Sequence, residues 1–104
     1  MADKDFVIQV GDFVQIRILL HTEKGRVKDF VVQLELLEDR EVPIARYDYA
    51  HGFAHRDVYH RDGRKTKEEV HESGLEAVVR MAISDFRENW PVYLRRCGYD
   101  YEEN

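Results

Sequence analysis

Titratable side chains gather in one short stretch of the chain, between residues 46 and 60. It contains three of the five histidines and two aspartates: His51, His55, His60, Asp48 and Asp57. From residue 46 to residue 67, six Arg or Lys stand against three Asp, so this band is net +3 in a chain of net charge −5. The functional site is therefore expected in this band of residues.

The first hypothesis is acid–base catalysis on RNA. A histidine beside a carboxylate can act as a general base, with the carboxylate fixing the ring tautomer. Arg46 or Arg56 would stabilise the charge that develops on a phosphate. Aromatic side chains of the band could stack on unpaired bases; they are Tyr47, Tyr49, Phe53 and Tyr59. This hypothesis predicts the following catalytic residues: Arg46, Asp48, His51, His55 and Asp57.

Two alternatives stay open for the same residues. Imidazole and carboxylate groups also bind zinc, nickel or iron. In an extended segment His55 and Asp57 project from one face, and His51 could add a third ligand. No fourth ligand is evident, so no cofactor is predicted and a divalent transition metal is kept as an alternative. The other alternative is structural, with Arg46 and Asp48 pairing with Glu35 and Arg17 across strands.

Composition excludes several classes of protein. The chain has 104 residues, 43% of them hydrophobic, which fits a single folded domain over residues 1–104 and not a disordered chain. The single cysteine, Cys97, rules out an internal disulfide and favours a reducing, cytoplasmic setting. The net charge of −5 argues against binding to duplex DNA. No apolar run exceeds three residues, so no membrane-spanning segment is expected.

Alternating apolar residues predict that strands fill the first two thirds of the chain. The expected strands are 6–10, 14–20, 27–37, 42–49 and 53–60, with a weaker one at 64–70. A helix should follow, because an apolar stripe with steps of three and four runs from Leu75 to Cys97. Ser73 and Glu76 have the spacing of a capping box. Pro91 interrupts the stripe, which leaves either one kinked helix or two nearly coaxial helices.

Short turns between consecutive strands imply antiparallel neighbours. The predicted fold is therefore α+β: an antiparallel meander of about five strands, with one long C-terminal helix packed on one face. The other face should carry polar residues, namely Gln15, Arg17, Gln33, Glu35, Arg46 and Asp48. Such a face is either solvated or covered by a partner, so a non-enzymatic interaction module or a homodimer is the alternative function.

The segment Arg46-x-Asp48-x-x-His51-x-x-x-His55-x-Asp57 carries a resemblance. The layout resembles small uncharacterised bacterial and archaeal proteins with a strand meander, a histidine-rich segment and a C-terminal helix. It is also similar to the TumE-type toxins of toxin–antitoxin pairs, although Tyr49 stands where those toxins carry Asn and their paired histidines are absent. This resemblance implies a toxin-like, RNA-directed protein with an antitoxin-like protein partner.

Overall fold

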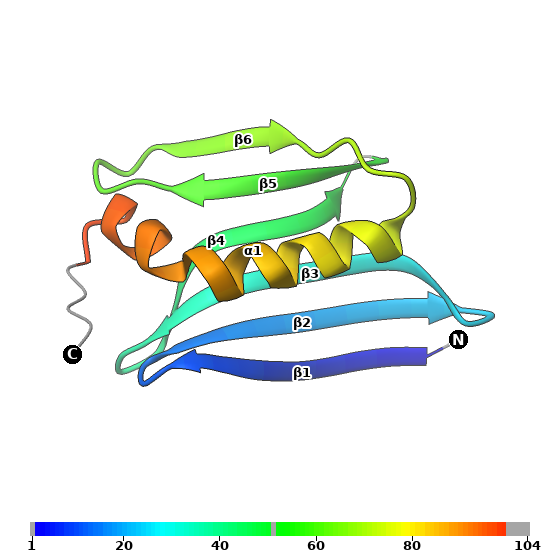
Figure 1. Cartoon of the computed structure of the whole chain (residues 1–104), viewed down its shortest axis with the longest axis horizontal. Coiled ribbons are helices and arrows are strands. Elements are labelled where there is room, and N and C mark those ends of the chain that lie inside the picture. Colours follow the sequence, from blue (N-terminus) through cyan, green and yellow to red (C-terminus); the bar gives the residue numbers. More distant parts are fainter. Residues whose placement is uncertain (1, 51, 100–104) are drawn as a thin grey trace.

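Six strands and one helix make up the described part of the computed structural model, which is residues 2–50 and 52–99. The strands are β1 (Ala2–Gly11), β2 (Val14–Glu23), β3 (Arg26–Leu37), β4 (Glu41–Ala50), β5 (Phe53–Tyr59) and β6 (Lys65–Glu69), and α1 (Leu75–Arg96) follows them. They form one antiparallel sheet in chain order, β1-β2-β3-β4-β5-β6, with α1 lying across it (Figure 1). The predicted α+β fold is confirmed, with six strands in place of about five.

The additional strand is β6, whose sequence gives a weak signal because all five of its residues are exposed. As an edge strand it pairs only with β5 and needs no apolar face of its own. A tight turn sets this pairing: the Gly63 amide donates to the His60 carbonyl over 3.0 Å, and Gly63 has φ +88°. A positive φ is accessible to glycine at little cost, which suits the Asp62-Gly63 pair to this turn.

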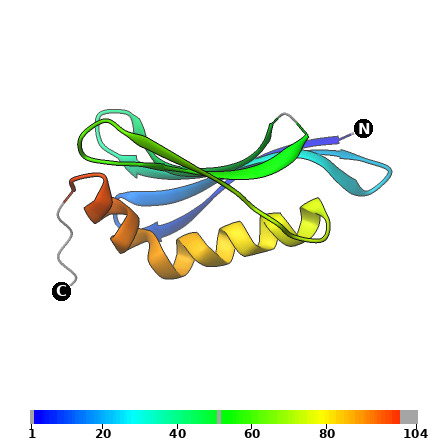
Figure 2. The ribbon, with the colours of Figure 1, turned by 90° about the horizontal axis from the view of Figure 1, so that it is seen from above.

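The alternating apolar residues of β2 and β3 face α1 and form the core. Ile16 pairs with Leu34, and Ile18 pairs with Val32, and all four are fully buried. The helix packs against β3, β4 and β5 from this side (Figure 2). The sheet thus has one face buried under α1 and one face turned away from it, as the period-two pattern predicts.

A single helix runs through Pro91, so of the two alternatives that the sequence leaves open, one helix is confirmed. Its buried positions follow the predicted stripe, and Phe86 at its centre is 0% exposed. The capping box does not form: the N-cap is Gly74, without a side-chain cap. Glu76 instead accepts a hydrogen bond from the Val27 amide over 3.0 Å, which ties the start of α1 to β3.

The end of α1 is set by a glycine. Gly98 has φ +91° directly after the C-cap residue Cys97, and its amide donates to the Arg95 carbonyl. Cys97 is half-buried, and burial raises the pKa of its thiol, which makes a nucleophilic role less suitable. Within residues 2–50 and 52–99, no helix combines the length and apolar character needed to cross a membrane.

Candidate functional site

The sheet face opposite α1, here called the open face, carries its side chains in rows across the strands. One row runs Asp5, Leu19, Val31, Asp48, His55, Glu69, and the next runs Val7, Arg17, Gln33, Arg46, Asp57, Lys67. All six polar residues predicted for this face lie on it, because Gln15 pairs with Glu35 in a third row. The predicted register is therefore confirmed.

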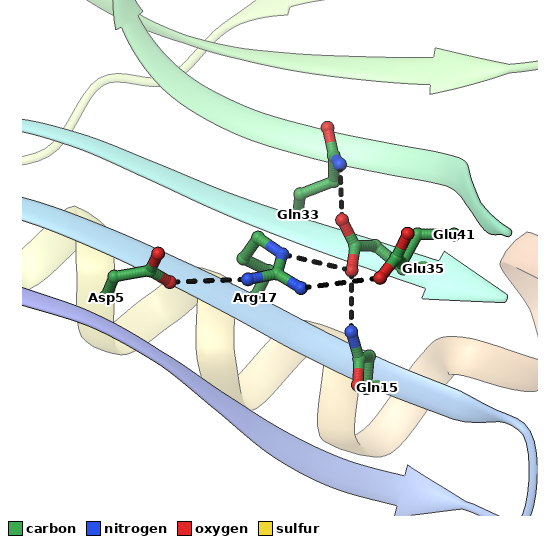
Figure 3. Close-up of polar contacts among 6 residues, drawn as sticks. All are labelled: Asp5, Gln15, Arg17, Gln33, Glu35 and Glu41. Carbon is green, nitrogen blue, oxygen red and sulfur yellow. Dashed lines mark hydrogen bonds and ion pairs between the residues drawn. The ribbon is translucent and has the colours of Figure 1, made fainter. Parts of the chain in front are cut away.

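Glu35 is the centre of a hydrogen-bond network on the open face, although it is only 3% exposed (Figure 3). Its Oε1 accepts from Gln15 Nε2 over 2.8 Å and from Arg17 Nε over 3.3 Å, and its Oε2 accepts from Gln33 Nε2 over 2.7 Å. Arg17 also pairs with Asp5 over 3.3 Å. This carboxylate is fully satisfied by its neighbours, which is the pattern of a structural group.

The structural alternative for Arg46 and Asp48 is wrong in its choice of partners. Glu35 and Arg17 bind each other, and Arg46 Nε instead lies 3.4 Å from Asp48 Oδ2 on the same strand. Directly across on β5, His55 Nδ1 lies 3.7 Å from the other oxygen, Asp48 Oδ1. One carboxylate therefore stands between a guanidinium and an imidazole.

Four of the five predicted catalytic residues come together on β4 and β5: Arg46, Asp48, His55 and Asp57. We call them the β4–β5 cluster. Arg46 is opposite Asp57 and Asp48 is opposite His55, so the four occupy two adjacent cross-strand pairs. The fifth, His51, lies outside the described residues.

Each member of the β4–β5 cluster has one buried atom without a hydrogen-bond partner among the described residues. These atoms are Arg46 Nε, Asp48 Oδ1, His55 Nδ1 and Asp57 Oδ1. His55 and Asp57 are only 3% and 5% exposed. A buried polar group without a partner costs about 1–3 kcal/mol, and the contacts of these four atoms at 3.4–4.0 Å offset only part of that cost. Such groups in a native fold are typical of sites kept for function.

Further side chains surround the cluster on β5 and β6. The Phe53 ring packs on the His55 ring with centroids 4.4 Å apart, and Phe53 itself is 43% exposed. The ammonium groups of Lys65 and Lys67 lie 3.9 and 4.0 Å from the Asp57 carboxylate. Lys65 and Lys67 were not among the predicted site residues, but their period-two spacing opposite Asp57 is a signal that the sequence contains.

Three residues assigned to RNA binding, Tyr47, Tyr49 and Arg56, lie on the helix side of the sheet, where Tyr49 packs against the core. Tyr47 is 3% exposed and donates to Asp85 Oδ2 over 2.7 Å, so the expectation that it stacks on bases is wrong. Arg56 donates to the Tyr93 hydroxyl over 3.0 Å and is separated by the sheet from the β4–β5 cluster. Burial, followed by the Asp85 hydrogen bond, raises the pKa of Tyr47 and raises that of Tyr93 to about 12.

Potential metal ligands do not gather in the described part of the chain. Residues 2–50 and 52–99 contain no group of three or more His, Cys, Asp or Glu arranged to hold a metal ion. His55 and Asp57 share a face as expected, but Asp57 faces two lysines. A cation would have to displace those ammonium groups, so the donor set does not favour a metal.

A hollow of about 380 Å³ lies beside the cluster, over β1, β2 and β3. Its open-face lining residues are Asp3, Asp5, Leu19, His21, Asp29 and Val31. Lys4, Leu20 and Phe30, which lie between these residues on the same strands, also line it, and no described residue of α1 does. Leu19 and Val31 belong to the row that continues into Asp48 and His55, which makes the hollow and the cluster neighbours.

The charge of the hollow is negative. Three aspartates line it against one lysine, Lys4, and His21 Nδ1 lies 2.6 Å from Asp3 Oδ1. The half-buried side chains of Leu19 and Val31 give it an apolar floor. The sequence alone does not indicate this hollow, because its residues come from three strands and include two ordinary aliphatic side chains.

A family model described as "Domain of unknown function (DUF7718)" matches residues 1–103, so the chain belongs to this family. The expected likeness to an uncharacterised family is thereby confirmed, and the match gives no link to toxins. No curated protein and no solved structure matches the chain.

Proposed function

We propose that this member of the DUF7718 family is a non-enzymatic interaction module, whose open face binds a lysine- or arginine-rich segment of a partner protein. The observation that carries the proposal is the hollow of about 380 Å³, with its apolar floor and acidic rim. Lysine and arginine combine an aliphatic stem with a cationic head. A surface that offers apolar and carboxylate groups together matches both parts.

The layout of the open face suits an extended segment. Leu19 and Val31 form the floor, and their row ends in Asp5 on one side and reaches Asp48 on the other. Neighbouring strands are about 4.8 Å apart, so these two carboxylates are separated by roughly 14 Å. Successive basic side chains of an extended peptide would reach both, in competition with Arg17 at Asp5 and with Arg46 at Asp48. The net charge of −5 would also speed the approach of a cationic partner.

The described geometry supports binding better than catalysis. Arg46 is held by Asp48, and the Phe53 ring packs on His55, so neither projects freely toward a substrate. Neither of them lines the hollow beside the cluster. A catalytic site needs its acid, base and cation to converge on one concavity, so this arrangement supports binding over catalysis.

RNA-directed activity is the second candidate, and one observation favours it. The exposed Phe53 ring packs on His55 and offers a stacking surface, and Lys67 and Lys65 lie farther along the same face, opposite Asp57 and Tyr59. If the protein is a toxin of this kind, its expression should arrest bacterial growth, and His55→Ala should relieve the arrest. Unimpaired growth on expression of the parent chain would count against this candidate.

The test of the interaction module uses a hexalysine peptide as probe, with hexaglutamate as the charge-reversed control. We expect hexalysine to bind and to bind more weakly as salt increases. Asp29→Asn should weaken binding by about 2- to 5-fold, which is the worth of one exposed ion pair. Glu88→Gln on the exposed side of α1 makes the same charge change and should leave the affinity unaltered.

Two results would contradict the proposal. The first is equal weakening by Asp29→Asn and Glu88→Gln, because the attraction would then be a property of overall charge. The second is comparable binding of hexaglutamate, which would show that the acidic rim does not select the ligand.

A further inference from the structure

The two edges of the sheet differ in character. β6 carries charge at four of its five positions and has no large apolar side chain. β1 is ten residues long and contains the apolar run Phe6-Val7-Ile8 at its centre. Proteins commonly protect edge strands with charge, as β6 does, because unpaired backbone groups can accept a further strand. The centre of β1 lacks this protection.

Exposed apolar surface coincides with the unprotected edge. Phe6 is 43% exposed and Val7 is 47% exposed, and they lie on opposite faces of β1. Phe6 points to the side of α1, but the helix packs on β3, β4 and β5 and leaves this side chain uncovered. In the described part of the chain, β1 pairs with β2 alone. Its other backbone edge is therefore free to bind a strand.

We infer that β1 is a dimerisation edge, at which the β1 strand of a second copy pairs antiparallel and joins the two six-stranded sheets. This inference is independent of the proposed peptide binding on the open face. It goes beyond that proposal because it names a different surface and a different partner.

The sequence of β1 is complementary to itself about Val7. In a two-fold antiparallel pairing centred on Val7, each Phe6 faces Ile8 of the other copy, which joins apolar side chains on the helix side. Asp5 then faces Gln9, a pair that can form a hydrogen bond, and Lys4 faces Val10. No like charges meet. Centring the pairing on Phe6 instead would set Lys4 against Ile8 and Asp5 against Val7, which is less favourable.

Antiparallel pairing keeps corresponding faces together. Residues directly opposite each other point to the same side of a sheet, so both helices would cover the same side of the joined sheet. The two open faces would likewise be continuous. A second copy of this chain is thus the occupant that satisfies the backbone edge and both exposed apolar side chains at once.

The test begins with the mass of the full chain in solution, measured by light scattering during size-exclusion chromatography. We expect a dimer that dissociates on dilution. Val7→Lys places a charge at the centre of the edge and should raise the dissociation constant at least tenfold. Ser84→Lys adds the same charge at an exposed position of α1 and should leave the dimer intact. Circular dichroism checks that both variants are folded.

Cysteine cross-linking tests the register, in a Cys97→Ser background. Opposed residues of an antiparallel pair have Cα atoms about 4.5–5.5 Å apart, within the range of a disulfide, so Val7→Cys should give a covalent dimer on mild oxidation. Lys4→Cys should not, because the two copies of residue 4 would be roughly 20 Å apart.

A parent chain that stays monomeric at every concentration would overturn the inference. So would a dimer that Val7→Lys leaves intact, because that dimer would use another surface. Cross-linking of Lys4→Cys as fast as Val7→Cys would reject the register.

Discussion

Replacement of His55 by phenylalanine separates a structural role for this side chain from a functional one. His55 is 3% exposed and its Nδ1 has no hydrogen-bond partner among the described residues. Replacing such a buried polar group with an apolar one raises the free energy of unfolding by about 1–3 kcal/mol. Its contact with Asp48, at 3.7 Å, offsets up to about 1 kcal/mol of this gain. The Phe side chain has a similar shape and keeps an aromatic ring against Phe53.

The net expectation for His55→Phe is a gain in stability of about 1 kcal/mol. Urea titration at neutral pH measures the free energy of unfolding, and thermal unfolding should show a rise of about 4–8 °C. His21→Phe is the matched control, because His21 lies on the same face but binds Asp3 over 2.6 Å. It should give no gain. If His55→Phe destabilises the protein by more than 1 kcal/mol, then His55 is a satisfied structural group and the reasoning is refuted.

Three other predictions concern the core, the buried carboxylate and alkaline pH. Phe86→Ala should cost about 3–5 kcal/mol of stability, whereas Glu88→Ala at an exposed position should cost less than about 0.5 kcal/mol in denaturant titrations. Glu35→Ala should cost about 2–4 kcal/mol by the same measurement, because the half-buried donors of Gln15, Arg17 and Gln33 lose their acceptor. The pKa of Tyr93 is raised to about 12. The protonated hydroxyl therefore adds to the free energy of unfolding below pH 10, and this contribution is lost as the pH rises from 10 to 12. Tyr93→Phe should therefore remove about 2 kcal/mol of the fall in stability over that pH interval and leave the part that comes from Tyr47, whose pKa is also raised.

The sequence predicts the order, faces and type of the elements because burial follows simple periods. Alternation in β2 and β3 correctly places Gln15, Arg17 and Glu35 opposite the core. The helical stripe correctly places Phe86 and continues through Pro91. In both cases one side of an element packs against the core, so the pattern of apolar residues is sufficient.

Local irregularities limit what the pattern can predict. Between β3 and β4, Glu35 pairs with Pro43 and Leu34 pairs with Ala45, so Ile44 is an additional residue. Ile44 and Ala45 are both 0% exposed, which breaks the alternation within β4. The start of α1 at Leu75 agrees with the predicted stripe, but the capping box is wrong, because Glu76 binds the distant Val27 amide instead. Such contacts depend on tertiary packing, which the local sequence does not encode.

The candidate site was predictable in its members but not in its surroundings. The concentration of histidine and aspartate identified Asp48, His55 and Asp57, and the register brings them together. The hollow requires the alignment of β1, β2 and β3, because its floor is made of Leu19 from one strand and Val31 from another. Aliphatic residues in a strand indicate only a strand until the neighbouring strands are known.

The most direct test of binding at the open face is to map amide chemical shifts while the labelled protein is titrated with hexalysine. If the open face binds the peptide, the shifts should saturate and should be largest at Leu19, Asp29 and Val31, on the strands that form the hollow. The amides of α1 on the other side of the sheet, such as that of Phe86, should stay nearly unchanged. Shifts that are largest on α1, or that are spread evenly over the surface, would contradict binding at the open face.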